Sequence, residues 1–309
     1  MMRKKWLRGC GFFLLVAVLL CGLNALYVQS DYYQSIEGLW RYDAMPEDLQ
    51  LVALGSSHGV YSFDFTLYPD YHSFNFAFAG QKPFFDFLLL ERYQSHLGEG
   101  CVVVLPAFLG TWYGEGESLP ARYYRILPPA TVRGLPGYSP IDVFLYHTMP
   151  VFSSKKGLFD AFAPRTGQWT VTRSEAVTDT VHAQRDAEVY IQHFYVRRSR
   201  VRNETEWAAV RNILALCRQR GWQPVLVTAP IANTFYQAVP AGILEGLYAD
   251  IEELRREYPE LLFWDDAQAD FLRYDDSLFW DLLHLNTRGQ EVYTRAFVER
   301  LRREGRLLP

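Results

Sequence analysis

The sequence predicts an α/β protein in which a mostly parallel sheet of about five strands is covered by helices on both faces. Short apolar runs of strand length alternate with longer segments of helical periodicity, and no internal repeat interrupts that order. Of the 309 residues, 49% are hydrophobic and 21% are charged, which is typical of a globular protein. We place this domain at residues 49–309.

Each expected strand is an apolar or β-branched run that ends at turn residues. In chain order the strands are Leu51–Leu54, Ser73–Phe78, Cys101–Leu105, Pro224–Ala229 and Leu261–Trp264. The expected helices are Lys82–Leu97, Glu204–Arg220, Gly242–Glu257 and a last one from about Arg288 to Arg303. Asn203 should cap the second of these and Gly221 should end it. Thr287 and Gln290 stand at capping-box spacing for the last one.

The N-terminal segment predicts one membrane-spanning helix. An apolar run covers residues 11–28, interrupted only by Asn24, and approaches the ~20 residues that a helix needs to cross the hydrocarbon core. The basic segment 1–10 should stay in the cytoplasm, which places the α/β domain outside the cell membrane. Residues 29–48 are then a juxtamembrane connector. A cleaved signal peptide is the alternative, but no clean cleavage site lies near Ala25.

Charge and cysteine usage exclude some classes of function. A formal net charge of −4 argues against nucleic acid as a partner. The sequence has no glycine-rich phosphate loop and no zinc-type His/Glu cluster, so we expect no cofactor and no metal. We expect all cysteines to be free thiols, with a disulfide between the last two as the alternative. These cysteines are Cys10, Cys21, Cys101 and Cys217.

A hydroxyl group is expected at the carboxyl end of the first strand. That strand ends at Gly55, followed by Ser56 and Ser57, and a glycine there permits a sharp turn that exposes the next side chains. Open α/β folds bind ligands at this edge of the sheet. Taken alone, a serine at this place is more often a helix cap.

A second polar pair stands just before the last helix. Asp281 precedes His284 by three residues, a spacing at which the carboxylate can accept the Nδ1 hydrogen and leave Nε2 facing outward as a base. A lone histidine there is more often a capping or surface residue. Together with the serine after the first strand, the pair predicts a catalytic triad with Ser57 as nucleophile and Ser56 as its rival.

These motifs resemble the SGNH, or GDSL-like, hydrolase superfamily. The Gly-Ser-Ser at 55–57 stands where that family has its Gly-Asp-Ser type motif, and Asp281 and His284 match its C-terminal Asp-x-x-His. The resemblance begins at about Leu51, matches poorly over 112–203, and implies a three-layer flavodoxin-like fold. Within the superfamily, the chain is most similar to the membrane-anchored branch that includes the D-alanyl-lipoteichoic acid biosynthesis proteins.

The resemblance also implies an oxyanion hole. The amides of Ser57 and of Gly80, which follows the second strand, match family donors, although Gly80 has the alternative role of letting the chain turn. Many members place an Asn after the third strand, but this chain has none between Asn75 and Asn203. The alternatives are Gln81 or Trp112 as the replacement donor, or a hole made of backbone amides alone.

Two further features bear on substrate contact, for which Gln81 and Trp112 are also candidates. His58 follows the nucleophile, and it either lines the mouth of the site or belongs to a solvated helix face. Residues 112–203 are expected to form an insertion over the carboxyl ends of the strands. Its aromatic side chains either stack on sugar rings or pack a core, and its basic cluster at 197–202 either meets anionic polymer or lipid phosphate, or is solvated.

We therefore expect a membrane-anchored, extracytoplasmic serine esterase or O-acyltransferase. By analogy its substrate is an acyl ester of a cell-envelope polysaccharide or teichoic-acid-like polymer, and a membrane-bound O-acyltransferase is a second expected partner. The missing Asn argues against an efficient general hydrolase, since losing one oxyanion donor costs roughly 3 kcal/mol in the transition state. The alternative is a non-catalytic scaffold of the same fold that binds polymer or such an acyltransferase.

Overall fold

The structure is a computed structural model, and its contacts divide the chain into two compact units. The N-terminal unit comprises Met1–Ala44 with Ser118–Val171, and the α/β body comprises Met45–Glu117 with Thr172–Pro309. Within the segment predicted as an insertion, residues 118–171 thus belong to the N-terminal unit. The residues described are 2–35, 39–114, 119–152, 157–163, 180–192, 201–270, 272 and 275–307.

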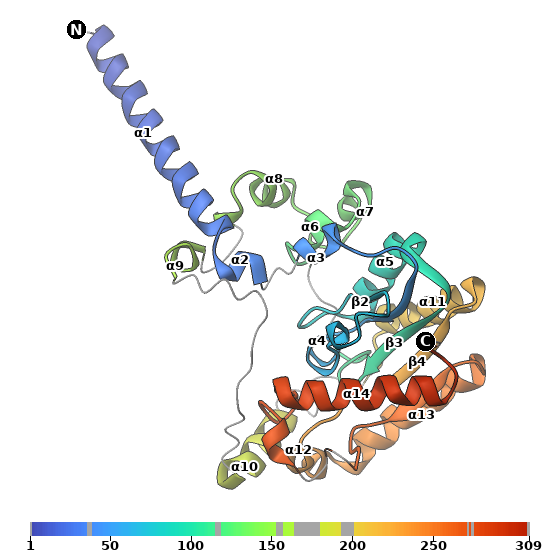
Figure 1. The fold of residues 1–309 in the computed structure, drawn as a ribbon. Coiled ribbons are helices and arrows are strands. Elements are labelled where there is room, and N and C mark those ends of the chain that lie inside the picture. Colours follow the sequence, from blue (N-terminus) through green and yellow to red (C-terminus); the bar gives the residue numbers. More distant parts are fainter. Residues whose placement is uncertain are drawn as a thin grey trace. The chain divides into compact units, whose positions relative to one another are not determined.

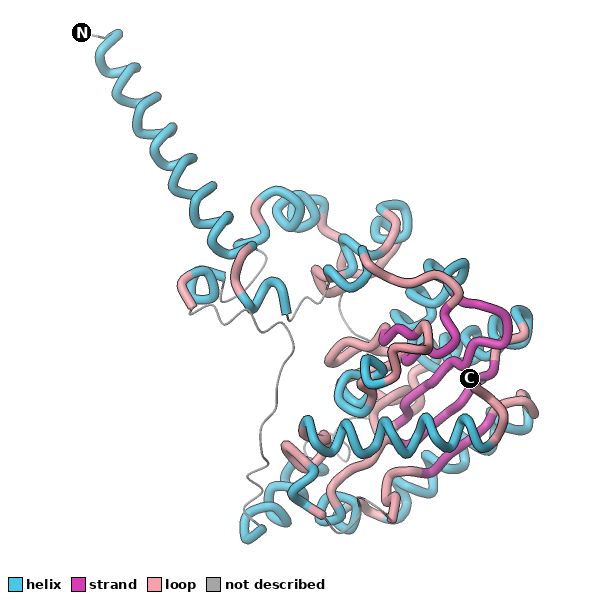
Figure 2. Tube along the Cα trace, viewed as in Figure 1, coloured by secondary structure: helices cyan, strands magenta, loops and turns pink. Residues whose placement is uncertain are grey.

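Five parallel strands form the sheet of the α/β body, in the order β2-β1-β3-β4-β5. The strands β2, β3 and β4 are labelled in Figure 1. Figure 2 shows them gathered in one sheet with helices around it. The predicted fold class is therefore confirmed, and the strand order is that of a flavodoxin-like doubly wound sheet. The strands are β1 (Leu49–Ala53), β2 (Ser73–Asn75), β3 (Leu97–Ala107), β4 (Gln223–Thr228) and β5 (Leu262–Asp265).

Helices cover both faces of this sheet, which gives three layers. On one face, α14 (Thr287–Arg303) packs its apolar side into a core cluster with the strands. On the other face lie α5 (Pro83–Tyr93) and α11 (Glu204–Arg220), which line a small space together with the ends of β1, β3 and β4. The interiors of the central strands β1, β3 and β4 are continuous apolar runs because both faces are buried there.

Further helices complete the α/β body. They are α4 (Ser57–Ser62), η1 (Phe65–Leu67), η2 (Gln94–His96), α10 (Thr180–Ile191), α12 (Asn233–Ala238), α13 (Ala241–Glu257) and η5 (Asp276–Leu278). The predicted helix over Lys82–Leu97 thus divides into α5 and the short η2. The second strand ends at Asn75, three residues earlier than predicted. The Asn75 side chain donates to Gly59 O at 2.9 Å and accepts from Ala77 N at 3.0 Å.

The predicted caps of α11 are confirmed. Asn203 Oδ1 accepts hydrogen bonds from the N–H groups of Thr205 and Glu206 at 3.0 and 3.2 Å. Gly221 ends the helix in the left-handed conformation, with φ at +70°. Glycine adopts such a φ without steric strain, because it has no Cβ.

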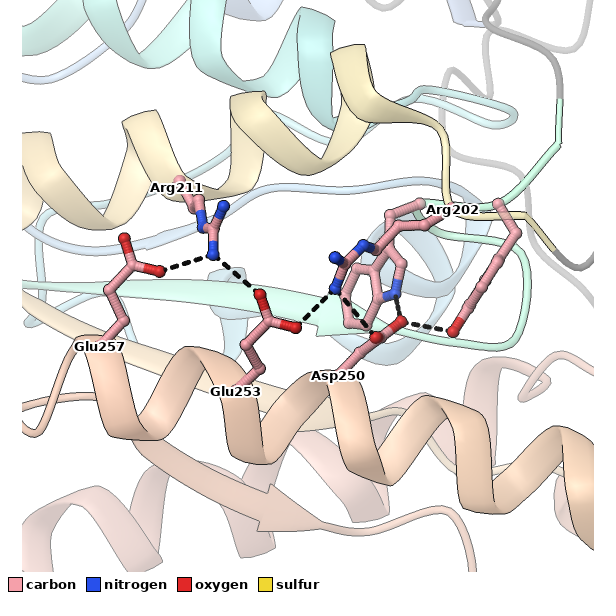
Figure 3. Close-up of polar contacts among 7 residues, drawn as sticks. Arg202, Arg211, Asp250, Glu253 and Glu257 are labelled. Atoms are coloured by element: carbon pink, nitrogen blue, oxygen red, sulfur yellow. Dashed lines mark hydrogen bonds and ion pairs between the residues drawn. The ribbon is translucent and has the colours of Figure 1, made fainter.

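A row of charges joins α11 to α13 (Figure 3). Arg202 lies 3.1 Å from Asp250 and 2.7 Å from Glu253, and Arg211 lies 2.8 Å from both Glu253 and Glu257. Exposed pairs of this kind contribute only about 1 kcal/mol or less each, but a network holds the two helices in one register. Arg202 is therefore part of a structural network. The other arginines of the predicted basic cluster lie outside the described residues: Arg197, Arg198 and Arg200.

The N-terminal unit contains one long apolar helix, α1 (Met2–Val28). Its segment Cys10–Val28 is long and apolar enough to cross a membrane, with a mean hydropathy of 2.3. The other elements of this unit are α2 (Asp31–Ser35), α3 (Trp40–Asp43), α6 (Tyr123–Ile126), α7 (Pro129–Arg133), α8 (Pro140–Thr148), η3 (Pro150–Phe152) and α9 (Gly157–Ala161). The residues predicted as a connector thus include two short helices.

The tight fit of α14 against its neighbours gives a first testable expectation. An added Cβ at Gly289 would lie 2.1 Å from Leu278 O and 3.1 Å from Leu285 Cδ2. We expect Gly289→Ala to lower the free energy of unfolding by about 1–3 kcal/mol, because backbone must move to admit the methyl group. Denaturant unfolding of the full chain in detergent measures this change.

Gly246 in the middle of α13 provides the matched control. There an added Cβ would meet only Tyr113 Oη, at 3.9 Å. We expect Gly246→Ala to be neutral or to stabilise by about 0.5–1 kcal/mol, since alanine is the better helix former. Equal effects of the two substitutions would contradict the packing described for α14.

Candidate functional site

The site begins at a sharp turn after β1. Gly55 has a φ of +99°, a conformation that favours glycine, and its N–H donates to Asp86 Oδ1 at 2.6 Å. Asp86 is a buried residue of α5 and accepts a second hydrogen bond from Gln81 Nε2 at 2.5 Å. A buried carboxylate needs hydrogen-bond donors of this kind, so Asp86 holds the turn at Gly55 in place. The turn makes Ser57 the first residue of α4, at the carboxyl edge of the sheet.

Ser57, His284 and Asp281 form one continuous chain of hydrogen bonds. Ser57 Oγ lies 2.8 Å from His284 Nε2, and His284 Nδ1 lies 2.9 Å from each carboxylate oxygen of Asp281. Asp281 Oδ1 also accepts from the Leu283 N–H at 2.8 Å. The structure thus brings together the three predicted side chains, in the geometry of a nucleophile, a base and a group that orients the base.

Ser56, the rival nucleophile, stands at the N-cap position of α4. Its side chain makes no capping hydrogen bond, and its carbonyl accepts from Val60 N at 3.1 Å. Ser57, one residue later, is the serine whose hydroxyl contacts the imidazole of His284. The geometry therefore favours Ser57 as the reactive hydroxyl.

Contacts between α14 and α4 hold the two ends of the body together at this edge. Gln290 Nε2 donates to Val60 O at 2.9 Å, and Thr294 Oγ1 donates to Ser62 O at 3.1 Å. Thr294 Oγ1 in turn accepts from Asp64 N at 2.9 Å. Sequence reasoning missed these roles, because nothing in a sequence marks a helix side chain as the partner of a backbone group 230 residues away.

The loop that carries Asp281 and His284 is closed on itself. Trp280 N–H donates to His284 O at 2.8 Å, so the two ends of the loop are joined. Asn286 is the N-cap of α14, and its Oδ1 accepts from Gly289 N at 2.9 Å. The predicted capping box at positions 287 and 290 is therefore wrong, because Asn286 fills the capping position one residue earlier.

Asp281 is held as a carboxylate. Burial on its own raises its pKa, but the hydrogen bond and charge of His284 and the backbone N–H groups of Leu283 and His284 outweigh burial, so its pKa lies below its ordinary value. An ionised Asp281 accepts the Nδ1 hydrogen and leaves Nε2 free to take a proton from Ser57. The aromatic ring of Tyr61 packs edge-on against His284, with centroids 5.2 Å apart.

His58 lies next to this chain of groups and is almost fully buried, with 8% of its surface exposed. Its ring centroid is 4.7 Å from that of Phe108 and 5.3 Å from that of His284. Burial and then the positive charge of His284, opposed by Asp281, lower the pKa of His58 to about 3. His58 is therefore neutral at physiological pH. Its Nε2 is buried without a hydrogen-bond partner among the residues that the structure describes.

Two residues proposed for substrate contact prove to be structural. Gln81 is buried, and its Nε2 is taken up by Asp86 Oδ1 and, at 3.3 Å, by Phe76 O. Trp112 has no exposed surface, packs edge-on against Trp207, and donates from Nε1 to Asp250 at 2.8 Å. The predictions that they replace the missing Asn or bind substrate are therefore wrong, because other buried groups use their donors.

The predicted oxyanion donors lie at the same edge. The segment after β2 continues alongside β1, since Phe76 N donates to Ala53 O at 2.7 Å and Phe78 N to Gly55 O at 3.2 Å. Gly80 follows in the left-handed conformation, with φ at +77° and an exposed surface. Its role as a donor remains a prediction. The position after β3 holds the buried ring of Phe108, which offers no side-chain donor.

Within the described parts of the chain, no group of three or more His, Cys, Asp or Glu side chains could hold a metal ion. Cys101 and Cys217 are buried free thiols, and Cys10 and Cys21 are exposed ones.

Comparisons with known proteins find similar folds only. No family model matches the chain, and no curated protein matches it. Solved structures that resemble it include a proposed acylhydrolase from Bacteroides fragilis, at 10% identity over 86% of this chain and 94% of that one, with a TM-score of 0.40. A GDSL-like lipase from Bacteroides thetaiotaomicron matches at 11% identity over 87% and 100%, with a TM-score of 0.40.

A third similar structure is a proposed platelet activating factor from Streptococcus pneumonia. It matches at 12% identity over 95% of this chain and 99% of that one, with a TM-score of 0.41. Similarity at this level establishes neither a family nor an activity for this chain. Any function must rest on the geometry of the site itself.

The lowered pKa of Asp281 gives a pH-dependent expectation. A carboxylate with a lowered pKa stabilises the fold above its unfolded value of about 4, and this contribution is lost as the pH falls through the lower folded value. We expect Asp281→Asn to be less stable than the wild type at pH 7, and this difference to disappear in acid. Denaturant midpoints of both proteins, measured across this pH range, test the expectation.

Asp270→Asn removes one negative charge from an exposed position and controls for net charge. A stability difference between wild type and Asp281→Asn that stays constant down to acid pH would contradict the hydrogen-bonded carboxylate.

Proposed function

We propose that this chain is a serine esterase or O-acyltransferase with Ser57 as its nucleophile. The observation that supports this most is the 2.8 Å contact between Ser57 Oγ and His284 Nε2, continued at 2.9 Å to Asp281. A serine hydroxyl is a weak nucleophile until a positioned base removes its proton. Here the base is oriented by a carboxylate on its other nitrogen, which is the full requirement for activation.

The reaction proceeds in two acyl-transfer steps. Ser57 Oγ attacks the ester carbonyl while His284 Nε2 takes its proton, and Asp281 stabilises the imidazolium that forms. The bond to the leaving alcohol then breaks, and His284 returns the proton to that alcohol. An acceptor hydroxyl attacks the acyl-serine ester, and its proton passes through His284 back to Ser57. Water as the acceptor makes the chain an esterase, and a sugar or polyol makes it a transferase.

Backbone amides of Ser57 and Gly80 are the proposed donors to the oxyanion. We assign His58 to contact with the substrate, because its Nε2 is a buried polar atom without a partner among the described residues. A native structure usually satisfies such atoms, and a bound ester or acceptor hydroxyl would do so here. His58 is neutral, so it adds no charge that would repel the imidazolium of His284.

The proposed substrate is an acyl ester of a cell-envelope polysaccharide or teichoic-acid-like polymer. The support for this is the apolar segment Cys10–Val28, which fits a membrane anchor with the α/β body outside the cell. The motifs also resemble those of the membrane-anchored branch that includes the D-alanyl-lipoteichoic acid biosynthesis proteins. A membrane-bound O-acyltransferase is the proposed protein partner.

A non-catalytic scaffold of the same fold is the second candidate. It is favoured by one observation: a buried phenylalanine, Phe108, follows β3 where many SGNH enzymes have a donor Asn. The connected side chains of Ser57, His284 and Asp281 argue against it, because a scaffold has no need of an activated serine.

A fluorophosphonate probe and a p-nitrophenyl ester test the nucleophile. We expect the full chain in detergent to be labelled and to hydrolyse the ester, and Ser57→Ala to lose both, with kcat/KM lowered at least about a thousandfold. Ser56→Ala is the matched control and should retain labelling. Labelling that survives in Ser57→Ala but vanishes in Ser56→Ala would overturn the assignment. A wild type that neither reacts nor turns over, even with an acyltransferase partner added, would favour the scaffold.

His58→Phe separates a role in substrate contact from a role in packing. Phenylalanine keeps an aromatic ring against Phe108 and removes the unpaired nitrogen. We expect kcat/KM to fall about 10–100-fold, the effect of losing one hydrogen bond of about 1.5–3 kcal/mol, while the unfolding midpoint stays constant or rises. Parallel measurement of ester hydrolysis and denaturant unfolding tests this. Wild-type kcat/KM in His58→Phe would remove His58 from the mechanism.

A further inference from the structure

The C-terminal end of α1 is surrounded by short helices of the same unit. Tyr27 near the end of α1 forms an apolar cluster with Val151 of η3 and Ala161 of α9, and Leu23 packs against it. Figure 1 shows α9 and α2 beside this end of the helix. We call α8, η3 and α9, with the adjoining Phe162, the juxtamembrane collar.

The collar also explains the polar interruption of the apolar segment. Asn24 Oδ1 accepts a hydrogen bond from Val151 N at 3.2 Å. An amide inside a membrane helix is unfavourable unless it is bonded to a neighbouring segment, and asparagine commonly serves that purpose. The bond therefore joins the collar to α1 at a defined depth.

The collar exposes five large apolar side chains, beside the polar Asp142, His147 and Thr148 of α8. The apolar ones are Ile141, Phe144, Phe152, Phe159 and Phe162, at 49–81% exposure. In the described part of the α/β body, only Val189, Val201 and Trp280 are both large, apolar and exposed. The apolar residues are thus concentrated around the membrane helix, and clusters of this kind mark interaction surfaces.

We propose that the collar is a membrane-interface surface whose exposed Ile and Phe side chains insert into the bilayer beside α1. This inference rests on the membrane-anchoring part of the proposed function and is independent of the catalytic part. The collar packs on α1, and other exposed side chains of α1, such as Phe13 and Leu15, would face lipid. The lipid bilayer is therefore the partner that we assign to the collar. Short amphipathic helices bind membranes in this way, with the apolar face at the boundary of headgroups and acyl chains.

The depth of the contact agrees with this placement. Asn24 lies four residues before Val28, the end of the apolar segment, which is about 6 Å along the axis at ~1.5 Å per residue. Interfacial helices bury their apolar face about 5–10 Å into that boundary. A collar bonded to Asn24 therefore stands at the boundary of headgroups and acyl chains, where the apolar side chains of interfacial helices insert.

Nitroxide labels on the full chain in phosphatidylcholine and phosphatidylglycerol vesicles test the proposal. The exposed Cys10 and Cys21 are first replaced by serine, while the buried Cys101 and Cys217 remain. Labels are then placed singly at Phe144→Cys and Phe159→Cys in the collar. Collisions with oxygen, which concentrates in lipid, are compared with collisions with a water-soluble nickel complex.

Two reference labels make the result decisive. Leu15→Cys lies in α1, and Glu299→Cys lies on α14 of the α/β body, where the wild-type side chain is 54% exposed. We expect the collar labels to resemble Leu15→Cys, with more frequent collisions with oxygen than with nickel, and Glu299→Cys to show the reverse.

Each other outcome overturns the proposal. Collar labels that collide with nickel as often as Glu299→Cys does would place the collar in water. If Leu15→Cys is lipid-exposed in the same experiment, α1 is still a membrane anchor and only the collar proposal fails. A Leu15→Cys label in water refutes the anchor and the collar together, without bearing on catalysis. Collar labels shielded from both reagents are covered by protein, and spin–spin broadening among them identifies a second copy of the chain.

Discussion

One buried carboxylate holds the edge of the sheet on which the site is built. Asp86 stands in the apolar helix α5 with 5% of its surface exposed, and an unpaired charge there would cost several kcal/mol. Its Oδ1 accepts from the N–H of Gly55 and from Gln81, so the requirement of Asp86 for donors is also what fixes the left-handed turn at Gly55. The direction of Ser57 follows from that turn, and α4 in turn is bonded to α14, which the loop of His284 leads into.

Much of the fold could be predicted because its strands and helix caps depend on residues that are close together in the sequence. A strand covered on both faces must be a continuous apolar run, so the interior of β3 was visible in the sequence, as were the caps of α11. The errors arose where an asparagine side chain bonds to backbone groups. At the end of β2, Asn75 bonds to Gly59 O and Ala77 N, and at the start of α14, Asn286 takes the cap that spacing alone assigned to the next residue.

The site could be predicted only as far as its chemistry is local. Asp281 and His284 are three residues apart, so their pairing is a short-range property, and the order of the motifs supplied Ser57. Gln81 and Trp112 were misassigned because a polar side chain looks the same in a sequence whether it meets substrate or satisfies a buried neighbour. Asp86 and Gln290 were missed because their partners are backbone groups 31 and 230 residues away.

The buried rings of Phe108 and His58, beside Ser57, His284 and Asp281, have two opposing effects on the proposed reaction. Phe108 follows β3, and a neutral His58 packs against it. Phe108 offers no side-chain donor to an oxyanion, and an enzyme that loses such a donor loses roughly 3 kcal/mol of transition-state stabilisation. The same burial lowers the local dielectric, which strengthens the interaction of the remaining amides with a developing charge. Of the two reactions that we propose, slow transfer of an acyl group to a bound hydroxyl tolerates the missing donor better than rapid hydrolysis, because a bound acceptor does not need the highest turnover.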